Sequence, residues 1–262
     1  MLQLDLKEKT AVIAGSTQGI GLASAQALAS LGANCVLMAR NEQKLGVAVG
    51  TLDTSKGQKH SFLVADFQKP EEVKAVIGLF AGSHGVDILI NNSGGPAGGP
   101  ITEAKTEDFL SALQQHLFCN HILTQAVIPH MKQTGYGRIV NVISTSVKVP
   151  LKNLGVSNTT RAAVASWAKT MANELGKYGI TVNNVLPGAT LTERLSTIID
   201  NKVSKARITK EEAEKEMLNE IPAGRFGKPE EIAAMVAFLC TPAAAYVNGT
   251  SIPVDGGRTG SI

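Results

Sequence analysis

One segment decides the fold, and it runs Thr10-Ala11-Val12-Ile13-Ala14-Gly15-Ser16-Thr17-Gln18-Gly19-Ile20-Gly21. Its first five residues form a continuous apolar run that predicts a buried strand, and apolar residues then recur at helical spacing. Gly15, Gly19 and Gly21 lie between these two elements, where the turn must be tight and a phosphate can approach the backbone. Free N–H groups at the start of the helix would point at the negative charge. The segment therefore predicts a strand, a phosphate-binding turn and a helix, although glycines alone also suit a tight turn without ligand.

Strand and helix patterns continue to alternate along the chain. Six more short apolar runs predict strands at residues 35–39, 62–65, 86–90, 138–143, 180–186 and 249–254. Apolar residues spaced three and four apart predict helices at 20–31, 70–80, 108–131, 164–175 and 229–239. Apolar strands that do not alternate with polar residues, separated by helices, indicate a parallel sheet covered on both faces. We expect an α/β fold of Rossmann type, in which residues 1–262 form a single domain around a doubly wound, seven-stranded parallel sheet.

The stretch 189–222 interrupts this alternation. Its portion Lys210 to Asn219 is charged and helix-prone, and the remainder has no regular pattern. A long irregular connection inside a compact domain is usually functional. We interpret 189–222 as a mobile lid over the ligand site.

The composition excludes several classes of protein. With 44% hydrophobic and 18% charged residues, the chain has the balance of a globular protein and not of a disordered one. A net charge of +3 without a dense basic run gives no signature of nucleic-acid binding. No signal-peptide pattern and no membrane-spanning apolar run occur, so we expect a cytoplasmic protein. Cys35, Cys119 and Cys240 are too scattered for a disulfide framework or a metal site, and we expect each to be a small buried residue.

The glycine spacing G-x-x-x-G-x-G and several later motifs resemble the short-chain dehydrogenase/reductase family. The resemblance extends from about Leu4 to Gly257, and the late motifs are most similar to the β-ketoacyl-carrier-protein reductase branch. The motifs are Asn91-Asn92-Ser93-Gly94 after the fourth strand (Asn-Asn-Ala-Gly in that family), Pro187-Gly188 after the sixth, Ile221-Pro222-Ala223-Gly224-Arg225-Phe226-Gly227-Lys228-Pro229-Glu230-Glu231-Ile232-Ala233, and Val254-Asp255-Gly256-Gly257. The resemblance implies a nicotinamide dinucleotide cofactor, a small carbonyl or alcohol substrate, and a homotetramer or homodimer built on the helices at 108–131 and 164–175 and the last strand.

The residue after the second strand indicates which dinucleotide binds. An acidic residue there would accept hydrogen bonds from the adenosine 2′-hydroxyl and repel a 2′-phosphate. This chain has Arg40, whose guanidinium matches a phosphate in charge and geometry. We therefore favour NADP over NAD, with a solvated helix-start residue as the alternative for Arg40.

The resemblance also implies further cofactor contacts. The whole loop Gly15, Ser16, Thr17, Gln18, Gly19, Ile20 and Gly21 would hold the pyrophosphate. Asp66 would meet the adenine amino group, with Phe67 packed on the adenine, unless Asp66 instead caps the helix that begins at Pro70. Asn92, Ser93 and Gly94 would flank the adenosine ribose, and Pro187, Gly188 and Thr190 would flank the nicotinamide.

At the catalytic positions the chain departs from the family. There a Tyr donates a proton, a Lys four residues later lowers the pKa of that Tyr and holds the nicotinamide ribose, a Ser binds the substrate oxygen, and an Asn anchors a water chain. Alignment from the flanking motifs places Ser144 at the Ser position, Ser157 at the Tyr position, Arg161 at the Lys position and His116 at the Asn position. The only tyrosines, Tyr136, Tyr178 and Tyr246, are not positioned to replace the missing acid.

These replacements have different consequences. Arg161 keeps a positive charge that can bind the nicotinamide ribose. Ser157 is far less acidic than a phenol and cannot easily donate a proton. We hypothesise that His116, through Ser144, Ser157 or water, supplies the proton, because its ordinary pKa suits acid–base work. The alternative is a hydrogen-bonded and inert histidine.

The sequence thus favours an NADP-dependent oxidoreductase that interconverts a ketone, 3-oxoacyl-like or another carbonyl, and an alcohol with atypical catalytic residues. A dinucleotide-binding protein of the same fold without catalysis is the main alternative. A hydrolase that uses Ser144 and His116 has little support, because no nucleophile-elbow sequence surrounds Ser144.

Overall fold

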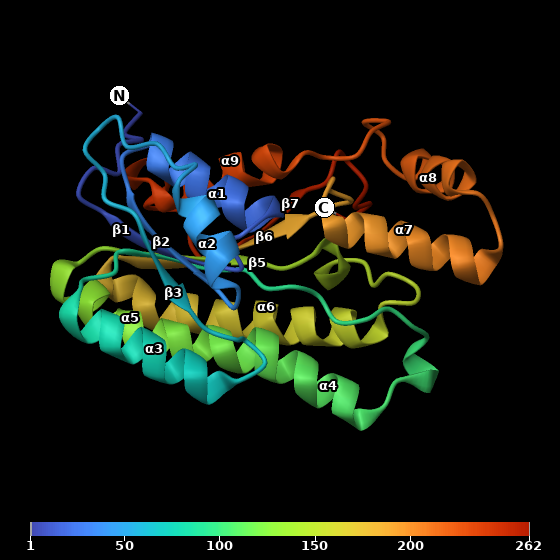
Figure 1. Cartoon of the computed structure of the whole chain (residues 1–262), viewed down its shortest axis with the longest axis horizontal. Helices are drawn as coiled ribbons and strands as arrows, with labels where there is room; N and C mark the ends of the chain where they lie inside the picture. Colours follow the sequence, from blue (N-terminus) through green and yellow to red (C-terminus); the bar gives the residue numbers. More distant parts are fainter. Residues whose placement is uncertain (1, 262) are drawn as a thin grey trace.

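Seven parallel strands form the central sheet of the computed structural model, which describes residues 2–261 (Figure 1). The strands are β1 (Thr10–Ala14), β2 (Asn34–Ala39), β3 (Ser61–Val64), β4 (Ile88–Asn91), β5 (Gly137–Val142), β6 (Ile180–Pro187) and β7 (Ser251–Val254). Their order in the sheet is β3-β2-β1-β4-β5-β6-β7, and every neighbouring pair is parallel. The direction of winding reverses between β1 and β4, and such a switch point opens a crevice at the carboxyl ends of the strands. The predicted fold class is confirmed.

Helices cover both faces of this sheet (Figure 1). One face carries α1 (Gly19–Ser30), α2 (Glu42–Val49) and α9 (Pro229–Cys240). The other carries α3 (Pro70–Ser83), α4 (Thr106–Leu113), α5 (Cys119–Thr134) and α6 (Gly155–Leu175). Single 3₁₀ turns occur at Ile101–Glu103, Thr145–Val147, Gly176–Tyr178 and Pro242–Ala244. No helix within residues 2–261 has the length and apolarity needed to cross a bilayer.

Each face of the sheet has its own core, because successive residues of a strand point to opposite sides. In β1, Ala11 and Ile13 pack in the core under α1 and α9, whereas Val12 and Ala14 pack in the core under α3, α5 and α6. All four side chains are fully buried, which explains why the strand is apolar throughout. The three cysteines are free and buried, as predicted.

The helix predicted at 108–131 is wrong as one continuous α-helix. Between α4 and α5 the chain makes a π turn, Gln114–Phe118, in which the backbone hydrogen bonds span five residues instead of the four of an α-helix. Such a turn is invisible to an apolar periodicity that continues on both sides of it. It matters for the site because His116 lies in it and is fully buried. The helix predicted at 164–175 begins earlier, at Gly155, so that it includes Ser157 and Arg161.

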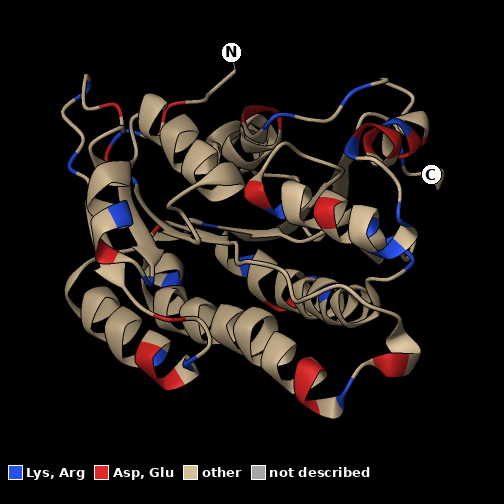
Figure 2. Ribbon diagram, turned by 45° about the vertical axis from the view of Figure 1, so that its right-hand side comes forward, with Lys and Arg blue, Asp and Glu red and all other residues tan. Residues whose placement is uncertain are grey.

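The stretch 189–222 is not irregular, as the sequence suggested, but mostly helical. It forms α7 (Glu193–Ala206) and α8 (Lys210–Asn219), which confirms the helix expected at 210–219. Threonine side chains cap both helices, and Leu195 and Ile199 of α7 pack against Ala213 of α8. Acidic and basic residues are interspersed along both helices (Figure 2). Its mobility stays a prediction.

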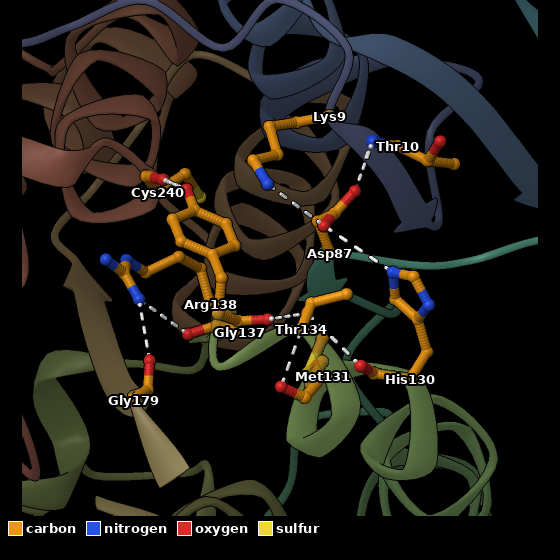
Figure 3. Close-up of polar contacts among 11 residues, drawn as sticks. Lys9, Thr10, Asp87, His130, Met131, Thr134, Gly137, Arg138, Gly179 and Cys240 are labelled. Carbon is orange, nitrogen blue, oxygen red and sulfur yellow. Dashed lines mark hydrogen bonds and ion pairs between the residues drawn. The ribbon is translucent and has the colours of Figure 1, made fainter.

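A polar cluster ties the opposite, amino-terminal edge of the sheet together (Figure 3). Asp87, which directly precedes β4, accepts a hydrogen bond from the backbone N–H of Thr10 at 2.9 Å. Its other carboxylate oxygen lies 3.3 Å from Nζ of Lys9 and 3.6 Å from Nε2 of His130. The ammonium of Lys9 also lies 4.2 Å from the centre of the Tyr136 ring. These contacts join the starts of β1 and β4 to the neighbouring helix end and have a structural role.

Candidate active site

The turn between β1 and α1 needs glycine at positions 15, 19 and 21. Gly15 and Gly19 have φ values of +59° and +56°, a region that other residues rarely adopt. A Cβ on Gly15 would lie 2.6 Å from the carbonyl oxygen of Asn92, and a Cβ on Gly21 would lie 2.2 Å from the carbonyl oxygen of Gly15. Because the atoms in the way belong to the backbone, they cannot rotate aside. The three glycines thus let the start of α1 approach the turn closely.

Neighbouring strands hold this turn in place. The side-chain amide of Asn92 donates to the carbonyl oxygens of Ala14 and Gly15 at 3.3 and 3.1 Å. The hydroxyl of Ser16 is fully buried and accepts a hydrogen bond from the N–H of Met38 at 3.0 Å. Ser16 therefore faces the sheet, so any contact with a cofactor would come from its backbone. Asn92 likewise acts on the turn, and its predicted place beside a ribose stays a prediction.

The start of α1 leaves its backbone donors free. Gln18, which precedes the helix, makes no capping bond, and the first turn contains no acidic residue. The Gln18 side chain instead donates to Glu193 of α7 at 2.6 Å. A methyl group of Thr192 lies beside Gly19, 3.2 Å from the place of a Cβ there. The cradle formed by 15–21 thus offers unpaired N–H groups to an anion and fits a dinucleotide pyrophosphate.

Arg40 lies at the position where the adenosine 2′-phosphate of NADP would bind. It follows β2 and is exposed, while the next residue, Asn41, caps α2 by accepting the N–H of Lys44 at 2.9 Å. Arg40 is therefore not needed to start that helix. Its guanidinium forms no hydrogen bond within residues 2–261, which leaves it free for a phosphate or for solvent.

The two residues predicted at the adenine have different positions. Asp66 follows β3, and its carboxylate accepts the N–H of Gln68 at 3.0 Å. The residue before α3 is Lys69, so Asp66 does not cap that helix. The Phe67 side chain is only 8% exposed and packs in the core under α3 and α5. This burial argues against an open aromatic face for adenine, and the expected packing of Phe67 on the cofactor is not supported.

Arg161 joins the carboxyl ends of two central strands. It extends from α6 with a relative exposure of 8%. One guanidinium nitrogen donates to the carbonyl oxygen of Val142 at 3.2 Å, and the other donates to that of Ser93 at 3.4 Å. Ser144 lies just beyond the same end of β5, and its hydroxyl oxygen accepts the N–H of Ser146 at 3.1 Å. The structure thus brings Ser144, Arg161 and the segment after β4 to one edge of the sheet.

Ser157 lies one helical turn before Arg161 on α6. Its side chain is 9% exposed, and its hydroxyl makes no hydrogen bond within the described part of the chain. No tyrosine takes its place: the Tyr136 hydroxyl donates to the carbonyl oxygen of Cys240 at the other edge of the sheet, Tyr178 ends the 3₁₀ turn that follows α6, and Tyr246 is fully exposed. The Ser157 hydroxyl is therefore not replaced by the hydroxyl of a tyrosine from another part of the chain.

His116 is buried and uncharged. Its Nδ1 is 2.6 Å from the hydroxyl oxygen of Ser93, and its Nε2 has no partner among residues 2–261. Burial, and then the positive charges of Arg161 and Arg194, lower the pKa of His116 to about 2. At neutral pH the ring carries no extra proton that it could release. This argues against the hypothesis that His116 is the proton donor and favours a hydrogen-bonded, neutral role.

Arg194 is a site residue that the sequence did not reveal. It is the second residue of α7 and donates from Nη2 to the carbonyl oxygen of Pro96 at 2.7 Å. Its guanidinium also lies beside Gly95, 3.3 Å from the place of a Cβ there. Burial lowers the pKa of Arg194. The only available signal was Thr192, a capping residue followed by Leu195 and Ile199 at helical spacing, which together predict a helix whose first turn holds position 194.

The residues predicted at the nicotinamide lie at the end of β6. Gly188 donates its N–H to the carbonyl oxygen of Val254 at 3.0 Å, and a Cβ on it would lie 2.7 Å from Cα of Asp255. Thr190 is 5% exposed and donates its hydroxyl to the carbonyl oxygen of Gly188 at 3.1 Å. Pro187 is the last residue of the strand. These residues form a fixed wall at the carboxyl edge, next to the start of α7.

Comparison with known proteins covers nearly the whole chain. The family model described as Enoyl-(Acyl carrier protein) reductase matches residues 14–259. A tropinone reductase homologue of Arabidopsis thaliana is 34% identical over 262 residues, covering 97% of this chain and 92% of the relative. The 3-oxoacyl-(acyl-carrier-protein) reductase of Vibrio cholerae is 34% identical over 258 residues, covering 97% and 98%. The crystal structure of L-sorbose reductase from Gluconobacter frateurii, complexed with NADPH and L-sorbose, superposes with a TM-score of 0.91 at 32% identity and covers 99% and 100%.

Proposed function

The chain belongs to the short-chain dehydrogenase/reductase family, and on that premise we propose that it is an NADP-dependent oxidoreductase that interconverts a ketone and an alcohol. One observation carries the proposal: a buried guanidinium, that of Arg161, bridges the carboxyl ends of β4 and β5 beside Ser144. A fixed positive charge at this place stabilises an oxygen that becomes negative during reduction. The substrate is 3-oxoacyl-like or another carbonyl compound.

The cofactor fits the residues at the carboxyl edge. The cradle at 15–21 would hold the pyrophosphate, and Arg40 would bind the 2′-phosphate that distinguishes NADP from NAD. Pro187, Gly188 and Thr190 would hold the nicotinamide, and Arg161 would bind its ribose. NADPH in the crystal structure of L-sorbose reductase supports this choice of cofactor. When bound, the nicotinamide supplies or accepts the hydride.

The protein side of the reaction rests on Ser144 and Arg161. The Ser144 hydroxyl oxygen already accepts a hydrogen bond from Ser146, so its O–H remains free to donate to the substrate oxygen. Arg161 stabilises the same oxygen as it becomes charged, but it does not release a proton near neutral pH. Ser157 has a much shorter side chain than a tyrosine and is a much weaker acid. We therefore propose that a water molecule gives the proton to the substrate oxygen and that the hydroxide left behind takes a proton from solvent.

A dinucleotide-binding protein without catalysis is the second candidate. Two observations favour it: Ser157 is not a competent acid, and His116 stays neutral. The test mixes the pure protein with NADPH and a panel of small ketones, oxo acids and acyl thioesters, and follows nicotinamide absorbance. Turnover supports the oxidoreductase. Tight NADPH binding without turnover across the panel supports the second candidate, and no binding of NADPH refutes both.

We further propose that the chain assembles as a homotetramer or homodimer through α4, α5, α6 and the last strand. Leu110 of α4 is 52% exposed and Phe118, just before α5, is 44% exposed. Large apolar side chains that are exposed on neighbouring helical segments favour burial against a second copy. Light scattering during size-exclusion chromatography tests this. A monomer at micromolar concentration would refute it.

A further inference from the structure

Arg161, which is buried, and Arg194, which is partly buried, face the same loop, and neither has an acidic partner within residues 2–261. We propose that Arg161 and Arg194 form an anion subsite, and that the carbonyl substrate of this protein carries a carboxylate that binds there. The inference rests on the proposed oxidoreductase function and narrows its substrates to oxo acids and the corresponding hydroxy acids.

Two arginines from different helices donate hydrogen bonds to the loop that follows β4. Arg161 reaches it from α6 and donates to the carbonyl oxygen of Ser93. Arg194 reaches it from α7 and donates to the carbonyl oxygen of Pro96. A guanidinium has five N–H donors, and these bonds, with the one to Val142, use two donors of Arg161 and one of Arg194. Most donors of both side chains therefore remain free.

The positive charges of Arg161 and Arg194 are not neutralised by an acidic side chain within residues 2–261. No salt bridge within residues 2–261 involves Arg161 or Arg194. Burial, and then the positive charge of Arg194, lower the pKa of Arg161 to about 10, so both side chains stay charged and repel each other. A buried cation without a counter-ion is costly. An anion placed between the two guanidinium groups would remove this repulsion.

A third polar group points to a ligand independently of the arginines. His116 is fully buried, and its Nε2 lacks a partner among residues 2–261. Because Ser93 can donate its hydroxyl hydrogen to Nδ1, the neutral ring would carry its own hydrogen on Nε2. A buried N–H without an acceptor is unfavourable unless a ligand supplies one. His116 thus adds a neutral donor close to the two cations.

The cofactor phosphates have other places to bind. The cradle at 15–21 suits the pyrophosphate, and Arg40 suits the 2′-phosphate. The substrate carbonyl is proposed to lie at Ser144, beyond the end of β5, close to Arg161. A Cβ on Gly94 would meet nothing within 4 Å, so the loop leaves space beside it. The remaining anion is then a group on the substrate, and a carboxylate matches the planar fork of a guanidinium.

The test replaces Arg194 with glutamine. Acetoacetate and 4-oxopentanoate are compared with their methyl esters as substrates with NADPH. We expect the wild type to prefer the acids, and Arg194→Gln to raise KM for the acids by about tenfold to hundredfold with little change for the esters. Lys205→Gln removes one positive charge from an exposed position on the same helix and serves as the matched control. It should leave both substrate pairs unchanged.

Equilibrium binding separates this inference from the proposed function. The affinity for NADPH is measured by its fluorescence, and the melting temperature of the NADP-saturated protein is measured with each acid and ester. Stabilisation by acids alone, lost in Arg194→Gln, supports the subsite even if no compound turns over. A tenfold loss of NADPH affinity in Arg194→Gln, without preference for acids, assigns the arginines to a cofactor phosphate and overturns the inference. Equal behaviour of acids and esters in both assays overturns it as well.

Discussion

Replacing Gly21 with alanine tests whether the turn at 15–21 holds the cofactor. The added Cβ would lie 2.2 Å from the carbonyl oxygen of Gly15 and 2.8 Å from the side-chain nitrogen of Asn92. The first distance is about 1 Å shorter than the closest ordinary C···O contacts, near 3.3 Å. Gly15 cannot yield alone, because its own N–H is bonded to Met38 and its oxygen to Asn92. The start of α1 must therefore move away from the turn.

The free energy of this shift can be estimated from the contacts that it disturbs. Overpacking a buried position costs roughly 1–3 kcal/mol. Weakening the two bonds that Asn92 donates to the turn adds roughly 0.5–1.5 kcal/mol each. The protein should thus lose about 2–6 kcal/mol of unfolding free energy. Displacing two backbone N–H groups that bond phosphate should cost about 3–4 kcal/mol of binding, which corresponds to a loss of NADPH affinity of more than a hundredfold.

Fluorescence titration with NADPH and thermal unfolding measure the two effects separately. The matched control is Gly78→Ala on the exposed side of α3, where an added Cβ meets nothing within 4 Å. That variant should gain up to about 1 kcal/mol of stability, because alanine is the better helix former, and should bind NADPH normally. If Gly21→Ala binds NADPH within twofold of the wild type, the turn does not hold the pyrophosphate and the cofactor assignment fails.

Three further predictions concern the site and the opposite edge of the sheet. The double variant Ser157→Tyr with Arg161→Lys should raise the single-turnover rate of carbonyl reduction by about a hundredfold or more, because a tyrosine hydroxyl in place would replace water as the acid. An unchanged rate would contradict the proposed proton source. The pKa of His116 falls from 6.5 to about 2 on folding, so the neutral ring favours the folded state above pH 6.5 and this contribution is lost as the pH falls toward 2. Urea unfolding should therefore show a steeper loss of stability between pH 6.5 and 4 in the wild type than in His116→Asn, by up to about 1.4 kcal/mol per pH unit, and equal slopes would refute the burial of a neutral ring. Asp87→Asn should lower the unfolding free energy by roughly 1–3 kcal/mol, because the charge facing Lys9 is lost, and should leave NADPH affinity unchanged; an affinity change would mean that the two edges of the sheet are coupled.

Strong periodicity made most of the sheet predictable. The seven apolar runs became the seven strands within a few residues, because only buried parallel strands tolerate such sequences. The role of the glycines in the turn was also predictable, because only glycine readily adopts positive φ angles and leaves room for close backbone contacts. Position in the sheet also brought Ser144, Arg161 and Ser93 to one edge, as parallel strands end together.

The failures come from contacts between distant segments. Arg194 is one charged residue in a charged stretch, and only its bond to Pro96, 98 positions away, separates it from a solvated side chain. Phe67 follows a strand, and the sequence does not state whether its ring turns toward the core or the cofactor. The sequence includes His116 among the candidate site residues, but its pKa depends on burial and on Arg161 and Arg194, which only the folded chain brings near.

The π turn at Gln114–Phe118 also sets a constraint on chain length. The extra residue is absorbed within this single turn, so the helical segments before and after it keep their faces although the chain is one residue longer. Deleting Leu117 would leave an ordinary α-helical turn, and the change would be concentrated in the turn that holds His116 and not in α4 or α5. His116 would then lose the position from which it contacts Ser93. Related chains with the same contact should therefore keep the extra residue, whereas chains without it can have a regular helix here.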